Sequence, residues 1–162
     1  MFSKLKKTVT PSVDILDSDF NDLDLFSFNG LTLRGKITDI YDGDTMTIVV
    51  LFRGEPTKYK LRMLGYDSPE MKPRKTCEHR DLHKQAGKKV RDYLREKYIN
   101  KKVWIKFVKE DKYGRLLGEV FEDEECTDCL NTKLINMGYG KGYDGGTKQE
   151  FTEEELLNII NN

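Results

Sequence analysis

Charged side chains gather in three short segments that each resemble a turn or the end of a strand. The segments are YDGDT, LRMLGYDSPE and EDKYGR. Together they supply carboxylates and guanidinium groups at Asp42, Asp44, Arg62, Asp67, Glu70 and Arg115. Surface charge is the simplest explanation of each residue taken alone. A functional interpretation therefore requires that the fold bring these positions to one place.

The residue types in the three segments suit one kind of chemistry. Clustered carboxylates raise one another's pKa unless a cation lies among them. Oxygen ligands without His or Cys suit Ca²⁺ or Mg²⁺. Two arginines facing such a cluster need an anion of their own, and a phosphodiester fits because guanidinium groups donate paired hydrogen bonds to phosphate oxygens. The combination indicates metal-assisted phosphoryl transfer, with the arginines stabilising the transition state.

The elements that must position these residues follow from hydrophobic periodicity. Residues 31–40, 45–52, 57–65, 102–110 and 116–121 have the alternating or β-branched pattern of strands. Helical spacing occurs over 81–98, a short run at 129–138, and a segment that opens with a capping box from Thr152 to Glu155. Three strands, a helix and two further strands are the layout of an OB-fold barrel. We expect an α+β, mainly β, fold: a five-stranded OB-fold barrel with two to three helices.

Charge is distributed unevenly along the 162 residues, although 28 basic and 28 acidic residues cancel overall. Residues 1–29 carry a net charge of −2 and are expected to form a flexible acidic extension. Residues 30–148, at +6, are the expected OB-fold domain, and residues 149–162, at −4, a short C-terminal helix. Within the domain, residues 72–109 hold 14 Lys and Arg against four Asp and Glu. This basic segment favours a polyanionic partner or a solvated helix face about equally.

Cysteines and histidines offer an alternative metal site. Cys126 and Cys129 form a CxxC pair, and Cys77, His79 and His83 lie elsewhere, so zinc ligands exist but match no known zinc spacing. Whether these five residues bind metal is left open beside ordinary reduced thiols. No apolar run approaches the roughly 18 residues of a membrane span, and no signal peptide is visible. We expect an intracellular monomer with no membrane partner.

The same three segments resemble the signature segments of the staphylococcal nuclease family, also called thermonuclease or micrococcal nuclease. The likeness runs from about residue 34 to 147 and keeps the order and near-expected spacing of the segments. It includes LNTKLINMGYGKGYDGG after the last predicted strand. The resemblance implies a calcium-dependent nuclease that hydrolyses DNA, RNA or both with little sequence preference. Such an enzyme leaves 3′-phosphate and 5′-hydroxyl ends.

The resemblance also implies a role for each matching position. Asp44 and Asp67 would bind Ca²⁺ through their carboxylates. Ser68 would do so through its main-chain carbonyl, and the family usually has Thr at that position. Glu70 would act as the general base. Arg62 and Arg115 would bind the phosphate. Tyr113 and Tyr143 would lie beside the bound nucleotide.

Two other functions remain open from the sequence. A catalytically weak OB-fold module could bind nucleic acid without cleaving it. A structural calcium-binding or protein-interaction domain would account for the carboxylates, but it would leave both arginines without a purpose. The nuclease is favoured because this one chain holds all five charged residues together: Asp44, Arg62, Asp67, Glu70 and Arg115.

Overall fold

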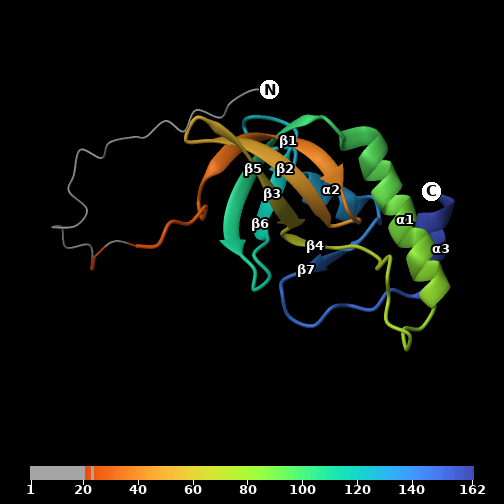
Figure 1. Cartoon of the computed structure of the whole chain (residues 1–162). Coiled ribbons are helices and arrows are strands. Elements are labelled where there is room, and N and C mark those ends of the chain that lie inside the picture. The colour runs from red at the N-terminus through yellow and green to blue at the C-terminus, as the bar shows by residue number, and fades with distance from the viewer. Residues whose placement is uncertain (1–20, 23) are drawn as a thin grey trace, which may run out of the picture.

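The strand-forming runs close into one barrel (Figure 1). The computed structural model describes residues 21–22 and 24–162. The barrel strands are β1 (Thr32–Ile40), β2 (Thr45–Phe52), β3 (Glu55–Met63), β5 (Lys102–Glu110) and β6 (Leu116–Phe121). Their order is β1-β2-β3-β6-β5, and β1 also pairs with β5. The β3–β6 pair is parallel and the others are antiparallel. The predicted five-stranded OB-fold barrel is confirmed.

Alternation along the strands separates the core from the surface that carries Arg62. On β3, Leu61 and Met63 face the barrel interior and are at most 1% exposed. Lys60 points outward, and Arg62 continues this outward row in a half-buried position. Successive side chains of a strand point to opposite faces, so the core residues on either side fix the direction of Arg62. The prediction that Arg62 lies opposite the apolar face is confirmed.

Three helices cover one side of the barrel (Figure 1). They are α1 (Arg80–Tyr98), α2 (Leu130–Asn136) and α3 (Glu153–Asn161). The first begins one residue earlier than predicted and buries a stripe that includes Val90 and Leu94. The last packs against α1 through the buried residues Leu156 and Ile159. Its capping box is formed as predicted, with Thr152 Oγ1 accepting from Glu155 N and the Glu155 carboxylate accepting from Thr152 N.

A small second sheet lies below the barrel in Figure 1. It pairs β4 (Gly65–Asp67) with β7 (Lys141–Tyr143) in antiparallel register. Residues 139–148 are rich in glycine, yet residues 141–143 form a strand. Buried Asn131 of α2 fixes the start of β4, because its Nδ2 donates to Leu64 O at 2.7 Å. The sheet matters for function because β4 ends at Asp67.

The N-terminal edge of the described chain joins the barrel core. Phe28 is 5% exposed, and its ring lies 4.8 to 5.3 Å, centroid to centroid, from those of Tyr59, Phe52 and Phe107. The core therefore includes a residue on the N-terminal side of the boundary expected at residue 30. No helix in the described part of the chain is both long enough and apolar enough to cross a membrane.

Candidate active site

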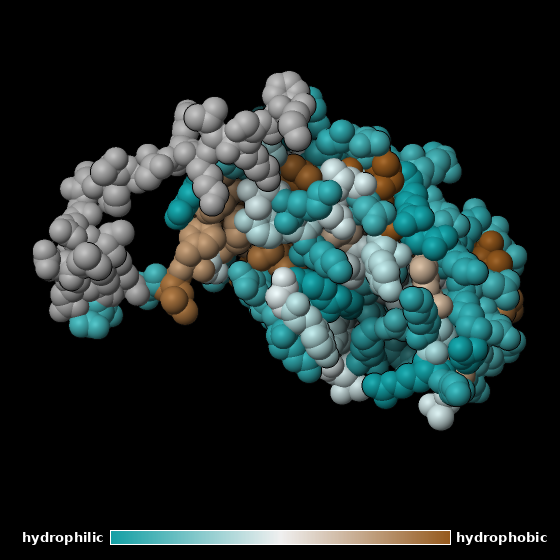
Figure 2. All heavy atoms as spheres, viewed as in Figure 1, coloured by the Kyte–Doolittle hydropathy of each residue, from teal (hydrophilic) through white to brown (hydrophobic). Residues whose placement is uncertain are grey.

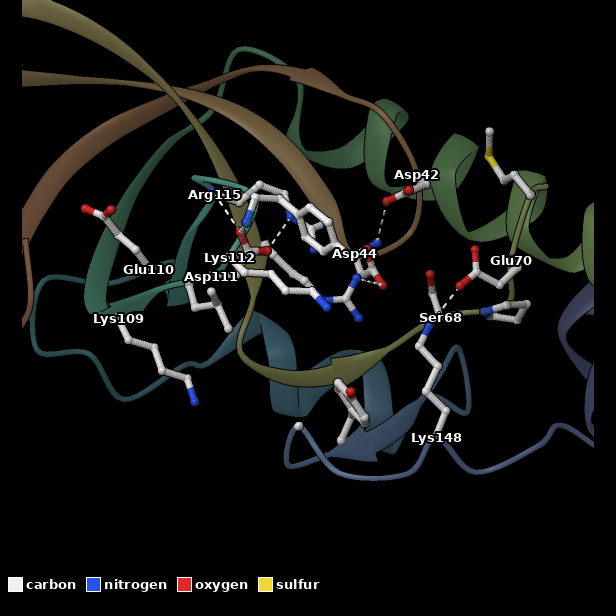
Figure 3. Close-up of a pocket in the computed structure, with 17 residues that line it drawn as sticks. Asp42, Asp44, Ser68, Glu70, Lys109, Glu110, Asp111, Lys112, Arg115 and Lys148 are labelled. Carbon is white, nitrogen blue, oxygen red and sulfur yellow. Dashed lines mark hydrogen bonds and ion pairs between the residues drawn. The ribbon is translucent and has the colours of Figure 1, made fainter. Parts of the chain in front are cut away.

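One cleft of about 710 Å³ gathers most of the residues that the sequence singled out (Figure 3). It lies where the β1–β2 turn, the end of β3, the turn after β4 and the β5–β6 turn meet. Its lining includes Asp44, Arg62, Ser68, Glu70, Tyr113, Arg115 and Tyr143. Asp67 lies in an adjoining cleft that shares Ser68 and Glu70 with the first. The fold thus brings all eight predicted site residues to one region.

Gly43 allows the turn that carries Asp44 to lie directly on the end of β4. A Cβ atom at Gly43 would lie 2.5 Å from Ser68 Oγ and 3.0 Å from Val90 Cγ1. No side chain fits in that gap, because real Cβ contacts at such distances are essentially unknown. Glycine therefore sets the close approach of Asp44 to the Asp67–Ser68 segment.

A second close approach supports the turn that carries Glu70. A Cβ atom at Gly87 of α1 would lie 2.5 Å from the main-chain oxygen of Pro69 and 3.1 Å from Met71 N. The middle of α1 therefore packs against the main chain on both sides of Glu70. The carboxylate itself remains accessible, since the Glu70 side chain is 54% exposed.

Arg62 joins the two predicted metal-binding carboxylates. Its Nη1 lies 2.6 Å from Asp44 Oδ2, and its Nη2 lies 2.9 Å from Asp67 Oδ1. Both aspartates are 5% exposed, so the three charges form a nearly desolvated group. Burial opposes the charge on Arg62, but Asp44 and Asp67 outweigh this effect and raise the arginine pKa.

Asp44 remains short of compensating charge despite this ion pair. Burial raises its pKa to about 7, and the neighbouring Asp42 adds to the effect. Arg62 and the hydroxyl of Thr45 act in the opposite direction and do not cancel it. A desolvated carboxylate with a raised pKa is a group that an additional cation would stabilise.

Arg115 extends from the turn between β5 and β6 and, among the described residues, is linked to the same carboxylates only through Thr45. Asp111 holds it: Arg115 Nε donates to Asp111 Oδ2 at 2.7 Å, and the main-chain N–H groups of Tyr113 and Arg115 donate to Asp111 Oδ1. At its other end, Arg115 Nη1 donates to Thr45 Oγ1 at 3.4 Å, and that hydroxyl donates to Asp44 Oδ1 at 2.8 Å. The turn thus aims the guanidinium toward the carboxylate group.

Lys148 completes a continuous chain of polar contacts. Its Nζ lies 2.8 Å from Glu70 Oε1 (Figure 3). The same Nζ lies 2.8 Å from Asp67 Oδ1. The Asp67 oxygen is the same one that accepts from Arg62. The contacts therefore run without a break through Arg115, Thr45, Asp44, Arg62, Asp67, Lys148 and Glu70.

Three residues of this arrangement were not predicted from the sequence as site residues. Thr45 ends the quoted YDGDT segment, so its place next to Asp44 could have drawn attention to it. Asp111 lies four residues before Arg115 across a tight turn, a spacing at which an aspartate often binds the turn's main chain. Lys148 was not singled out, because it lies just after the quoted LNTKLINMGYGKGYDGG segment and nothing in its own sequence surroundings marks it.

The two tyrosines lie at the cleft but differ in surroundings. Tyr113 is 73% exposed, and the Arg115 guanidinium lies 5.7 Å from its ring centroid. Tyr143 is half-buried on β7, with the Arg62 guanidinium 5.9 Å from its ring centroid. An exposed ring and a partly covered one, each beside an arginine, are both able to stack on a base.

The donor set at the cleft fits one class of cation. The described residues contain no group of three or more His, Cys, Asp or Glu side chains arranged to hold a metal ion. Among the described residues, neither the cysteines and histidines nor the carboxylates of the cleft are therefore assembled into a formed metal site. Two carboxylates, a main-chain carbonyl and water would suit Ca²⁺, which accepts six to eight oxygen ligands in irregular geometry. Asp44 and Asp67 are suitably placed, since both reach one guanidinium.

Comparison with known proteins identifies the family. Residues 60–162, more than half of the chain, match the family model described as staphylococcal nuclease homologue. The chain belongs to the staphylococcal nuclease family. The matched region of this nuclease-family chain includes Arg62, Asp67, Ser68, Glu70 and Arg115. Asp44 lies before it, on the first turn of the barrel.

Individual relatives extend the likeness across the barrel. An uncharacterised protein of Methanocaldococcus jannaschii is 29% identical over 178 residues, which cover 94% of this chain and 83% of that protein. Endonuclease YhcR of Bacillus subtilis strain 168 is 31% identical over 115 residues. That alignment covers 68% of this chain and 9% of YhcR. A protein of Escherichia coli O157:H7 named as an uncharacterised endonuclease is 20% identical over 80% of this chain and 71% of its own length.

Proposed function

We propose that this chain is a calcium-dependent nuclease that hydrolyses phosphodiester bonds of DNA, RNA or both with little sequence preference. The products would carry 3′-phosphate and 5′-hydroxyl ends. Family membership and relatives named as endonucleases support a nuclease. The calcium requirement is inferred from the carboxylates at the cleft together with the family resemblance, and the position of cleavage from the family resemblance alone.

The metal would be held by the two buried aspartates and the adjacent main chain. Asp44 and Asp67 would each supply carboxylate oxygen, and Ser68 its main-chain carbonyl. When bound, a divalent cation would neutralise charge on the phosphate oxygens. Ser68 in place of the family's usual Thr costs little in this scheme, because the ligand is main-chain oxygen. The proposal accounts for the raised pKa of Asp44, since a metal would supply the charge that the buried carboxylate lacks.

Glu70 and the two arginines would perform the chemical step. Glu70, the most exposed carboxylate of the three, would accept a proton from the attacking water. Arg62 and Arg115 would bind phosphate oxygens and stabilise the extra negative charge at five-coordinate phosphorus. Water would attack phosphorus and give its proton to Glu70, the bond to the 5′-oxygen would break, and that oxygen would take a proton from solvent to become the 5′-hydroxyl.

The observation that carries this proposal is the unbroken chain of contacts from Arg115 to Glu70. It links the candidate metal ligands, the candidate base and both phosphate-binding cations across four separate segments. A module that only binds nucleic acid needs exposed cations and aromatics, and it has no use for two buried aspartates on one guanidinium. Figure 2 shows mainly hydrophilic residues on the part of the surface where β4 and β7 lie in Figure 1.

Cleavage assays with defined metals test the proposal. Purified protein would be incubated with 5′-labelled single-stranded DNA, duplex DNA and RNA in Ca²⁺, Mg²⁺, Zn²⁺ or chelator. We expect cleavage in Ca²⁺, little turnover in Mg²⁺, which demands stricter octahedral geometry, and none in chelator. Products should be extended by a polymerase only after a phosphatase removes the 3′-phosphate.

Two conservative variants separate catalysis from binding. Arg62→Lys and Arg115→Lys keep the charge and lose the paired hydrogen bonds, so both should lower kcat strongly, by about 10²-fold or more. Lys60→Arg, on the outward face of the same strand, serves as a matched control. Full activity in chelator, activity with Zn²⁺ alone, or binding of nucleic acid without cleavage in any metal would contradict the proposed function.

A further inference from the structure

Lys148 occupies a position that the proposed nuclease mechanism does not use. It comes from the segment between β7 and α3, and it reaches into the cleft toward Ser68 and Glu70 (Figure 3). Its Nζ contacts one oxygen of a candidate metal ligand, Asp67, and one oxygen of the candidate base, Glu70, each at 2.8 Å. A lysine in this position contacts, and partly compensates, the two carboxylates that the mechanism needs free.

Lys148 is the cation that moves most easily when another cation binds. Arg62 also contacts Asp67, but its side chain is 13% exposed and fixed on a barrel strand. The Lys148 side chain is 40% exposed and has a flexible four-carbon stem. A divalent cation that takes Asp67 as a ligand would therefore displace the Lys148 ammonium before the Arg62 guanidinium.

The segment that carries Lys148 keeps it near the cleft after such displacement. On one side, Tyr143 belongs to β7, which pairs with β4, and its hydroxyl donates to Gly146 O at 3.3 Å. On the other side, Phe151 is buried, and Lys141 Nζ donates to Glu150 O at 2.8 Å. With both ends anchored, the displaced ammonium remains beside Glu70 and the cleft.

We propose that Lys148 is an internal counter-ion that competes with the divalent cation at Asp67 and, once displaced, binds a phosphate of the substrate. This inference rests on the proposed function. Charge supports the exchange. Three carboxylates, Asp44, Asp67 and Glu70, face two cations, Arg62 and Lys148, when no metal is present. A divalent cation would add positive charge to this cluster, and a phosphate anion beside the displaced ammonium would offset part of it.

The exchange predicts opposite effects of one substitution on two ligands. Lys148→Met keeps the stem and removes the ammonium. Ca²⁺ should then bind about two- to fivefold more tightly, since a partly exposed ion pair no longer has to be broken. With Ca²⁺ saturating, a nucleoside 5′-monophosphate, which has no diester to cleave, should bind roughly tenfold more weakly because a charged hydrogen-bond donor is lost.

Isothermal titration with CaCl₂ and then with thymidine 5′-monophosphate measures both effects without turnover. Lys148→Arg keeps the charge and should remain near wild type for both ligands. Lys109→Met removes a charge from the β5 side of the same cleft and controls for the general field, since Lys109 makes none of the ion pairs found among the described residues, whereas Lys148 pairs with Asp67 and Glu70. Its effect on Ca²⁺ affinity should be smaller than that of Lys148→Met.

Unchanged or weaker Ca²⁺ binding by Lys148→Met would overturn the competition. Undiminished nucleotide binding by the same variant would overturn the transfer of Lys148 to phosphate. Either result, obtained while the wild-type protein binds Ca²⁺ and cleaves DNA, would leave the proposed function intact. A wild-type protein that binds no Ca²⁺ would instead reject the calcium site itself.

Discussion

Asp44→Asn should stabilise the metal-free protein while abolishing its function. The Asp44 carboxylate has a pKa of about 7 in the folded protein, against 3.8 for the unperturbed group, because burial outweighs its ion pair with Arg62. Between these two pH values the folded state binds more protons than the unfolded state. The free energy of unfolding of the wild-type protein therefore falls as pH rises from about 4 to about 7, and it stays lower at higher pH.

The size of the effect follows from the shift. A difference of about three pH units, at roughly 1.4 kcal/mol each, corresponds to a loss on the order of 4 kcal/mol above pH 7. Asparagine resembles the protonated aspartate and does not lose this energy. At about 2 to 4 °C per kcal/mol for a chain of this length, the variant should melt about 10 °C higher than wild type at pH 8. At pH 4 the two should melt together.

Thermal melts at pH 4, 6 and 8, in chelator and in Ca²⁺, measure this directly. Subtracting the melting temperature of wild type from that of the variant removes the contribution of the titrating groups that both proteins share. Ca²⁺ should raise the melting temperature of wild type at pH 8, since it binds the folded state, and raise that of the variant much less. An Asp44→Asn protein that melts at or below wild type at pH 8 in chelator would refute the claim that Asp44 is a destabilising, metal-requiring carboxylate.

Three further substitutions test the supports of the cleft and core. Gly43→Ala should lower both the melting temperature and the cleavage rate, because the new Cβ would collide with Ser68 Oγ; wild-type cleavage with an unchanged melt would contradict the close approach. Asp111→Asn should reduce kcat about tenfold or more with little change in stability, since it weakens the support of the Arg115 guanidinium; cleavage at the wild-type rate would show that Arg115 needs no such support. Phe28→Ala should cost about 3 kcal/mol in urea unfolding, as expected for a buried aromatic side chain; a loss under 1 kcal/mol would place Phe28 outside the core.

Much of the barrel follows from residue patterns that are local. Alternating apolar residues and β-branched runs mark the five barrel strands, and the stripe that includes Val90 and Leu94 marks α1. The capping box at Thr152 identifies the start of α3. Such patterns are readable because a strand or an amphipathic helix must bury one face whatever its partners are.

The features that the sequence did not show depend on contacts between distant segments. Strands β4 and β7 have three residues each and include glycine, and they form because Gly65 and Tyr143 meet across 78 positions. Phe28 lies in an acidic stretch of sequence without periodicity, yet its ring packs against those of Phe52, Tyr59 and Phe107. Lys148 reaches Asp67 only because β7 brings its segment alongside β4. No periodicity in one segment encodes such pairings.

Single-turnover cleavage by Glu70→Gln tests the central claim most directly. Glutamine keeps the size of the side chain and its capacity to accept a hydrogen bond from Lys148, and it removes the base. With excess enzyme and saturating Ca²⁺, we expect the cleavage rate of a labelled DNA strand to fall by a factor on the order of 10² to 10⁴. Substrate affinity and the thermal melt should stay close to wild type, since Glu70 lies at a solvated rim. Cleavage by Glu70→Gln at the wild-type rate would contradict the assignment of this cleft as a nuclease active site with Glu70 as its base.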